Sequence, residues 1–222
     1  DITGTTTATY SLVNPAATAN GNKYRVVVTG CGGATINSNE ANLTVNPAAT
    51  ITTQPADATA CSGADISFSV TATGTALTYQ WQISTDGGAT WSDITGTTTA
   101  TYSLVNPAAT EDGNKYRVVI NGSCTTNLTS DAATLSVSEA PVISAQPQDA
   151  AICEDGTATF SVTASGAPSY QWQVSTDGGT TWTDITGATN ASLSADEMDH
   201  SNATSLVQVV VTNSCGSVTS GS

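Results

Sequence analysis

The chain repeats itself at a spacing of about 92 residues, and this period limits what it can fold into. Residues 93–110 reproduce residues 1–18 letter for letter, as DITGTTTATYSLVNPAAT. The stretch YQWQISTDGGATWSDITG at residues 79–96 returns with few changes at residues 170–187. Periods of about 20–50 residues are typical of solenoids and propellers, whereas about 90 residues make a whole small β domain. The sequence therefore predicts similar domains arranged in tandem.

The period divides the chain into one complete copy and two partial ones. We expect residues 47–138 to form the complete copy. Residues 1–46 match its C-terminal part, and residues 139–222 match all of it except the last strand. Because the first residue falls inside a copy, we expect the chain to be a piece of a longer array. A copy of about 90 residues buries a modest core, so a covalent crosslink would help it to stay folded.

Charge and composition exclude several classes of function. The chain has 4 Lys and Arg residues against 18 Asp and Glu residues, a formal net charge of −14. Binding to DNA, RNA or anionic lipid requires a basic surface, so we predict no nucleic-acid partner. No apolar run reaches the length of about 18 residues that suggests a membrane span, so we predict no direct membrane insertion by this segment. Frequent β-branched residues between Gly, Asn and Asp turns indicate an all-β chain.

The cysteines indicate the cellular compartment. Cys61 precedes Cys124 by 63 residues and Cys153 precedes Cys215 by 62, so the spacing repeats with the copies. We therefore predict two structural disulfides, Cys61–Cys124 and Cys153–Cys215, each within one copy. Cys31 occupies the Cys124 position of the first copy, and its partner would precede the first residue. Repeated cysteine pairs indicate an oxidising location outside the cytoplasm.

Alternating apolar and polar residues predict short strands around an aromatic core. In residues 77–84, Tyr79, Trp81 and Ile83 share one face while the intervening residues are polar. About seven such strands, with a Trp in the third, fit a Greek-key β-sandwich. Five large residues fall at the inward-facing positions of these alternating patterns, and we expect them in the cores of the copies: Trp81, Trp172, Phe68, Phe160 and Tyr116.

These stretches resemble the immunoglobulin-like repeats of large secreted and cell-surface proteins of Bacteroidetes. The matching phrases are TTQPADATACSG, FSVTATG, YQWQISTDGGATW, GNKYRVVINGSC and AATLSV. The resemblance implies tandem immunoglobulin-like Greek-key β-sandwiches and a spacer or adhesive role. Phe68 and Val118 stand where antibody-type domains carry cysteines, so the disulfide would lie at the strand ends instead. The stretch EDGNKY at residues 111–116 is similar to a tyrosine corner, whose Tyr116 hydroxyl would bond to nearby backbone, and Val207 replaces this Tyr in the third copy.

Few residues are candidates for binding. Trp91 and Trp182 each follow a turn, where an aromatic ring either covers the sheet edge or stacks on a sugar. The STDGG turns at residues 84–88 and 175–179 hold one carboxylate each, whereas Ca²⁺ takes six to eight oxygen ligands. Residues 196–200 (DEMDH) contain the only histidine and form the best metal candidate, but a solvated loop explains them more simply. We therefore predict no metal and no cofactor.

Catalysis finds no support in the sequence. The single histidine, His200, occurs in one copy only and cannot serve a repeated active site. Nucleophile elbows, phosphate-binding loops and HExxH motifs are absent from the sequence. The repeated cation Arg117 is expected to pair with an acid such as Asp112. We predict that the chain is not an enzyme.

Three hypotheses for function remain. We favour a structural or adhesive stalk or fibre of an extracellular or cell-surface bacterial protein, in which neighbouring repeats of the same chain are the partners. One alternative is a module whose loops bind a surface glycan or a protein. Another is an accessory region of a large secreted enzyme. The edge left open by the missing last strand could also accept a strand from another subunit.

Overall fold

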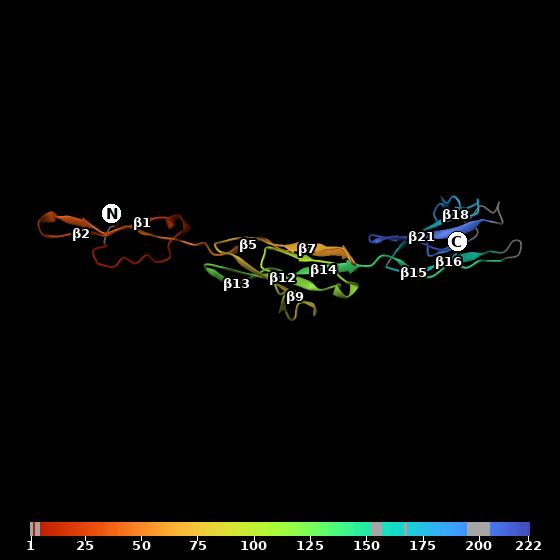
Figure 1. The fold of residues 1–222 in the computed structure, drawn as a ribbon, viewed down its shortest axis with the longest axis horizontal. Helices are drawn as coiled ribbons and strands as arrows, with labels where there is room; N and C mark the ends of the chain where they lie inside the picture. Colours follow the sequence, from red (N-terminus) through yellow and green to blue (C-terminus); the bar gives the residue numbers. More distant parts are fainter. Residues whose placement is uncertain (1, 3–4, 152–156, 167, 195–204) are drawn as a thin grey trace.

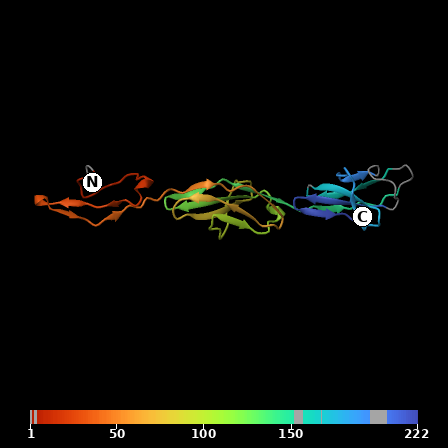
Figure 2. The same cartoon turned by 90° about the horizontal axis from the view of Figure 1, so that it is seen from above.

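The protein forms three units arranged end to end in an extended line. The computed structural model describes residues 2, 5–151, 157–166, 168–194 and 205–222. Two views at right angles show the same linear arrangement, with a narrow neck between successive units (Figures 1 and 2). We call these the N-terminal unit (residues 5–46), the central unit (residues 50–138) and the C-terminal unit (residues 142–222).

The central unit is a β-sandwich whose larger sheet is built around two long neighbouring strands. β9 and β12 pair antiparallel, with Trp81 opposite Val118. The sheet runs in the order β10-β9-β12-β14-β6, with β13 paired to β12. The opposite layer holds the pairs β5–β8 and β7–β11. The strands are β5 (Thr50–Thr53), β6 (Ala58–Cys61), β7 (Ile66–Ser69), β8 (Thr71–Thr73), β9 (Thr78–Ser84), β10 (Ser92–Asp93), β11 (Thr101–Leu104), β12 (Lys115–Gly122), β13 (Thr125–Thr129) and β14 (Ala133–Ser138).

One strand of the central unit changes layers. The stretch from residue 50 to residue 61 is divided at Pro55, since β5 lies in the smaller layer and β6 joins the larger sheet. Proline cannot donate a ladder hydrogen bond, so it suits the break. β6 pairs parallel with β14, which places Cys61 opposite Ser138. Consequently Cys61 lies beside the last residue of the central unit.

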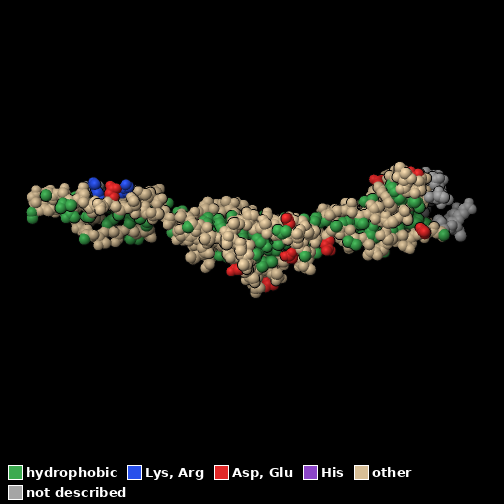
Figure 3. All heavy atoms as spheres, in the orientation of Figure 1, with side chains coloured by type: hydrophobic (Ala, Val, Ile, Leu, Met, Phe, Trp, Pro, Cys, Tyr) green, Lys and Arg blue, Asp and Glu red, His purple; other side chains and the backbone are tan. Residues whose placement is uncertain are grey.

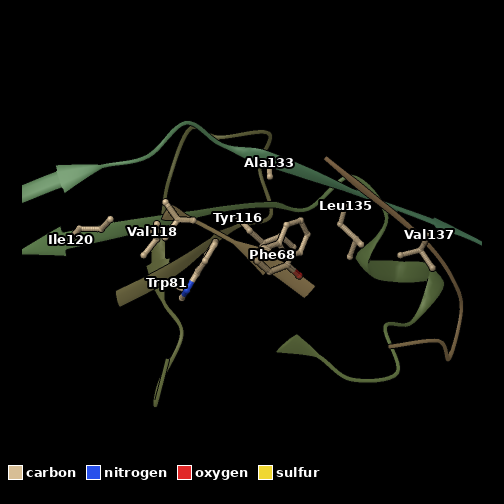
Figure 4. Packing of buried hydrophobic residues seen from close by; sticks show 9 residues of the cluster. Phe68, Trp81, Tyr116, Val118, Ile120, Ala133, Leu135 and Val137 are labelled. Carbon is tan, nitrogen blue, oxygen red and sulfur yellow. The ribbon is translucent and has the colours of Figure 1, made fainter. Parts of the chain in front are cut away.

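Aromatic rings fill the space between the two layers of the central unit (Figure 4). Trp81 and Tyr116 are fully buried, and Phe68 is 1% exposed. The Phe68 and Tyr116 rings stack with their centroids 4.6 Å apart. The indole nitrogen of Trp81 donates a hydrogen bond of 3.0 Å to the carbonyl oxygen of Thr99. The inward-facing residues of alternating strands thus form one continuous core.

The tyrosine corner proposed for Tyr116 is wrong. Its hydroxyl oxygen is buried and makes no hydrogen bond of ordinary geometry with the described residues. The ring instead packs between Phe68 and Tyr102, whose centroid lies 5.6 Å away. Burial raises the pKa of Tyr116 to about 12.

The C-terminal unit repeats this arrangement with its own core. Trp172 is fully buried on β18, opposite Val209 of β21, and Phe160 is partly buried against the same cluster. Val207 occupies the position of Tyr116 and is 8% exposed. Residues 196–200 and Cys153 lie outside the described residues. The strands are β15 (Val142–Ala145), β16 (Thr159–Ser161), β17 (Thr163–Ser165), β18 (Ser169–Ser175), β19 (Thr183–Asp184), β20 (Ser192–Ser194), β21 (Leu206–Asn213) and β22 (Gly216–Thr219).

The N-terminal unit is an open set of hairpins. β1 pairs with β4, and β2 pairs with β3. Apolar side chains that the repeat would place in a core are exposed here, among them Val26 at 47% and Val28 at 58%. Its elements are η1 (Ala17–Ala19), β1 (Lys23–Tyr24), β2 (Val27–Thr29), η2 (Cys31–Gly33), β3 (Thr35–Asn37) and β4 (Ala41–Asn42).

Candidate functional site

In the described part of the chain, the candidate functional site is the junction between the central and C-terminal units. β14 ends at Ser138 and β15 begins at Val142, so three residues connect the two units. Pro141 is buried in this linker, and its ring restricts the backbone of residue 140 to extended conformations. A short linker that includes proline already favours an extended connection.

A disulfide provides a second connection across this junction. Cys61, at the end of β6, is bonded to Cys215, in the turn between β21 and β22. Their Cα atoms are 5.4 Å apart and their positions differ by 154 residues. The sulfur of Cys215 lies 3.5 Å from the carbonyl oxygen of Ser138, directly beside the start of the linker. We call the Cys61–Cys215 disulfide the junction clamp.

This pairing corrects the predicted Cys61–Cys124 and Cys153–Cys215 bonds. Cys124 is exposed and has a free thiol, and Cys153 lies outside the described residues. Cys61 sits at the end of the central unit that faces the C-terminal unit, whereas Cys124 precedes β13 at the opposite end (Figure 1). At about 3.3 Å per residue along β12 and β14, these ends are roughly 40 Å apart. A disulfide requires Cα atoms within about 7 Å, so Cys61 and Cys124 of the central unit cannot meet.

Asn213 holds the turn that carries Cys215 against the linker. Its side-chain nitrogen donates to the carbonyl oxygen of Glu139 at 2.7 Å and to that of Gly166 at 2.9 Å. Its side-chain oxygen accepts a hydrogen bond of 2.8 Å from the backbone nitrogen of Cys215. One amide side chain therefore connects the cysteine turn, the linker and a loop of the C-terminal unit.

Gly166 allows this close approach. Its φ angle is +87°, a region that L-residues rarely adopt. A Cβ atom at this position would lie 3.1 Å from the side-chain nitrogen of Asn213 and 3.3 Å from the carbonyl oxygen of Glu139. Both the backbone conformation and the available space therefore require glycine beside the linker.

The junction between the N-terminal and central units is held differently. The backbone nitrogen of Ala49 donates to the hydroxyl of Thr125 at 2.7 Å, and Ala49 is 6% exposed. Gly74 and Gly122 leave room for it, since a Cβ atom on Gly74 would lie 3.0 Å from the Cα of Ala49. Cys124 directly precedes Thr125, the first residue of β13, but its thiol is free. This junction is therefore packed without a disulfide among the described residues.

The two tryptophans that follow turns are half-buried. The guanidinium carbon of Arg117 lies 4.2 Å from the centroid of the Trp91 ring, and the Arg117 Nε donates to the side-chain oxygen of Gln82 at 2.8 Å. The expected pairing of Arg117 with Asp112 is therefore wrong, because the carboxylate of Asp112 accepts from the backbone nitrogen of Val137 instead. The cation occupies one face of the ring that could otherwise stack on a sugar.

The carboxylates of the STDGG turns bind their own loops. Asp177 accepts hydrogen bonds from the backbone and hydroxyl of Thr181 and from the hydroxyl of Ser175, which lower its pKa to about 2. Corresponding bonds from Thr90 and Ser84 hold the pKa of Asp86 well below its usual range. Hydrogen bonds to a carboxylate favour its charged form. These acids therefore shape the turns in which they lie.

The charged groups are thinly spread over an otherwise uncharged surface (Figure 3). Lys23 and Glu40 form an exposed ion pair of 3.2 Å on the N-terminal unit. Within the described ranges, no three His, Cys, Asp or Glu side chains are grouped closely enough to hold a metal ion. In the same ranges, no helix has the length and apolar character needed to cross a membrane.

Comparisons with known proteins identify the fold. The family described as "Domain of unknown function (DUF8696)" matches residues 50–139 and 143–222. The chain is similar to immunoglobulin domains 1–4 of Sidekick-1, with 17% identity and a TM-score of 0.57 over 93% of this chain and 58% of that one. It is also similar to the I67–I69 I-band fragment of titin, with 15% identity and a TM-score of 0.54 over 80% of this chain and 64% of that one. The predicted all-β immunoglobulin-like fold is confirmed.

One curated relative is similar in sequence. Endoglucanase C of Cellulomonas fimi is 36% identical over 154 residues, which cover 68% of this chain. The matched part is 14% of that protein, so this chain spans a small portion of its length.

Proposed function

The chain belongs to the family described as Domain of unknown function (DUF8696), and its central and C-terminal units are immunoglobulin-like β-sandwiches joined end to end, so we propose that it is a stiff spacer in an extracellular protein. The junction clamp carries this proposal. A single linker leaves neighbouring domains free to bend, whereas a second covalent connection beside it restricts that motion. A disulfide that closes a loop of more than 100 residues also stabilises the chain by roughly 5 kcal/mol.

The same bond supports a location outside the cytoplasm. Disulfides persist in oxidising compartments and are rare where thiol reductants are abundant. The net charge of −14 favours solubility and keeps neighbouring arrays apart. A cell-surface stalk or an adhesin of a Bacteroidetes species is the finer form of this proposal, and the neighbouring repeats are then the partners.

Small-angle X-ray scattering tests the spacer function. We compare the oxidised protein with a Cys61→Ser/Cys215→Ser variant, and we use Cys124→Ser as the matched control because it removes an exposed thiol outside the clamp. The parent and the control should give the same narrow, elongated distance distribution. The double variant should give a smaller mean radius of gyration and a broader distribution. Identical scattering from all three proteins would show that the clamp does not set the shape.

A second candidate is an accessory region of a secreted polysaccharide-degrading enzyme. It is supported by the 36% identity to part of endoglucanase C. Such a region would either space a catalytic domain or hold the enzyme on its substrate. Sedimentation with insoluble cellulose separates the two roles. A spacer stays in the supernatant, whereas a binding module appears in the pellet and is released by soluble cello-oligosaccharide.

A further inference from the structure

Two equivalent cysteines in the chain differ in their bonding. Cys124 lies in the turn between β12 and β13, and Cys215 lies in the turn between β21 and β22. Both turns point toward the preceding unit, and a strand residue that borders each turn, Thr125 or Asn213, bonds to the linker that leads into its own unit. Cys215 is bonded to Cys61, whereas Cys124 is exposed with a free thiol.

The N-terminal unit, which faces Cys124, has an open backbone edge at residues 43–46. In the central unit, β6 pairs parallel with residues 135–138 and brings Cys61 to the junction. The equivalent residues 43–46 of the N-terminal unit keep the contacts on their other side, since the backbone nitrogen of Leu43 donates to the carbonyl of Asn22 at 2.9 Å. Among the described residues, no strand pairs with residues 43–46 where β6 would lie. The free thiol and the open edge therefore lie on the two sides of one junction.

We propose that Cys124 is the receiving half of a second junction clamp. Its partner is the cysteine of a strand like β6, which pairs parallel with residues 43–46 and belongs to a half-repeat equivalent to residues 47–92. This half-repeat would also cover the exposed Val26 and Val28, because its counterparts of Phe68 and Trp81 pack on the equivalent residues of the central unit. The inference stands on the geometry of the junction and does not depend on the spacer function.

The covalent step requires an oxidant, which we take to be a small or protein-borne disulfide, RSSR. The thiolate of one cysteine attacks a sulfur of RSSR, forms a mixed disulfide and releases RS⁻. The thiolate of the second cysteine then attacks the protein sulfur of that mixed disulfide and releases the other RS⁻. Two protein thiols are oxidised, RSSR is reduced to two RSH, and the two thiol protons balance the two released thiolates.

A longer chain tests this inference. Residues 47–92 are placed directly before Asp1, which repeats the order found in the central unit because residues 1–18 and 93–110 are identical. The addition supplies one cysteine, a duplicate of Cys61, and should consume two thiols. The number of thiols that react with a chromogenic disulfide under denaturing conditions should therefore fall by one relative to the parent. A control with Ser in place of the added cysteine should retain the thiol count of the parent.

Peptide mapping under non-reducing conditions identifies the bond. A peptide that joins the added cysteine to Cys124 supports the inference, and intact mass distinguishes a bond within one chain from a bond between two chains. The Cys61–Cys215 peptide in the same digest reports that the longer chain has folded. A sample that contains this peptide but retains the Cys124 thiol, or that joins the added cysteine to Cys31, overturns the inference.

Discussion

Residues 5–18 of the N-terminal unit and 97–110 of the central unit are identical in sequence, yet they take different structures. Residues 101–104 form β11 and pair with β7, whereas the identical residues 9–12 form no strand. The local features are the same in both places, because the short helices η1 and η3 (Ala109–Glu111) begin at equivalent positions and Asn14 and Asn106 have φ angles of 49° and 50°. Turns are therefore fixed by neighbours in the sequence, while a strand requires a partner from elsewhere in the chain.

The burial of equivalent side chains also differs between the N-terminal and central units. Val118 and Ile120 are fully buried in the central unit, whereas their equivalents Val26 and Val28 are 47% and 58% exposed. Complete burial of such a side chain contributes about 1.5–3 kcal/mol. The N-terminal unit therefore lacks most of the free energy that stabilises its twin, even though its inward-facing positions are occupied by equally apolar residues.

Completing the N-terminal unit should have the largest effect. When residues 47–92 precede Asp1, the amides of Val26 and Val28 should become protected in a new sandwich. Their hydrogen-exchange rates should fall on the order of 10³-fold or more, because a complete domain is stable by about 5 kcal/mol or more. Unchanged exchange would mean that the exposed residues do not form the second half of a core.

Truncating one core position in each unit should have unequal effects. Val118→Ala should lower the free energy of unfolding of the central unit by about 2 kcal/mol, because it removes methyl groups from a packed core. The matched variant Val26→Ala, in the N-terminal unit, should change the free energy of unfolding by less than about 0.5 kcal/mol. Urea titration followed by tryptophan fluorescence measures both. Equal losses would contradict the difference in burial.

The buried hydroxyl of Tyr116 should make the central unit sensitive to alkali. Between the ordinary pKa of 10 and the folded pKa of about 12, the unfolded chain ionises first, so stability is lost as pH rises through this window. Tyr116→Phe should remove this loss and raise the free energy of unfolding by about 1 kcal/mol at neutral pH. Tyr24→Phe, at the equivalent position, should change neither. Thermal denaturation at pH 7 and pH 11 measures these effects.

The smallest effect should come from acid. Hydrogen bonds from Thr181 and Ser175 hold the pKa of Asp177 near 2 against an ordinary value of 3.8. The stability that they contribute is complete above pH 3.8 and is lost as pH falls toward 2. In the variant Asp177→Asn, the amide chemical shifts of residues 175–181 should therefore change less with pH over this range than they do in the parent protein. The N-terminal unit has no such turn and serves as an internal control.

Strand positions could be predicted from the sequence where alternation was regular. Of the three residues predicted to face inward from β9, Trp81 is fully buried, and Tyr79 and Ile83 are partly buried against the same core. The division between β5 and β6 could not be predicted, because the two short strands have no alternation that assigns them to different layers. The parallel pairing of β6 with β14 depends on contacts distant in sequence.

The predicted cysteine pairing was wrong for a related reason. A spacing of 63 residues repeats with the copies whether each bond lies within a unit or joins two units. The choice depends on which end of the sandwich each cysteine occupies, and this follows from the direction of β6 and the position of the turn before β13. A full assignment of strand directions would have placed Cys61 and Cys124 at opposite ends.

The clamp has a consequence when the chain is pulled from its ends. Tension that enters at the first residue reaches Cys61, crosses the sulfur–sulfur bond to Cys215 and leaves through the last few residues. The polypeptide between these two positions, a separation of 154 residues, carries no covalent load. At up to about 3.5 Å per residue, roughly 500 Å of contour length is withheld from extension until the bond is reduced. Reductants would therefore act on this molecule as a release for stored length.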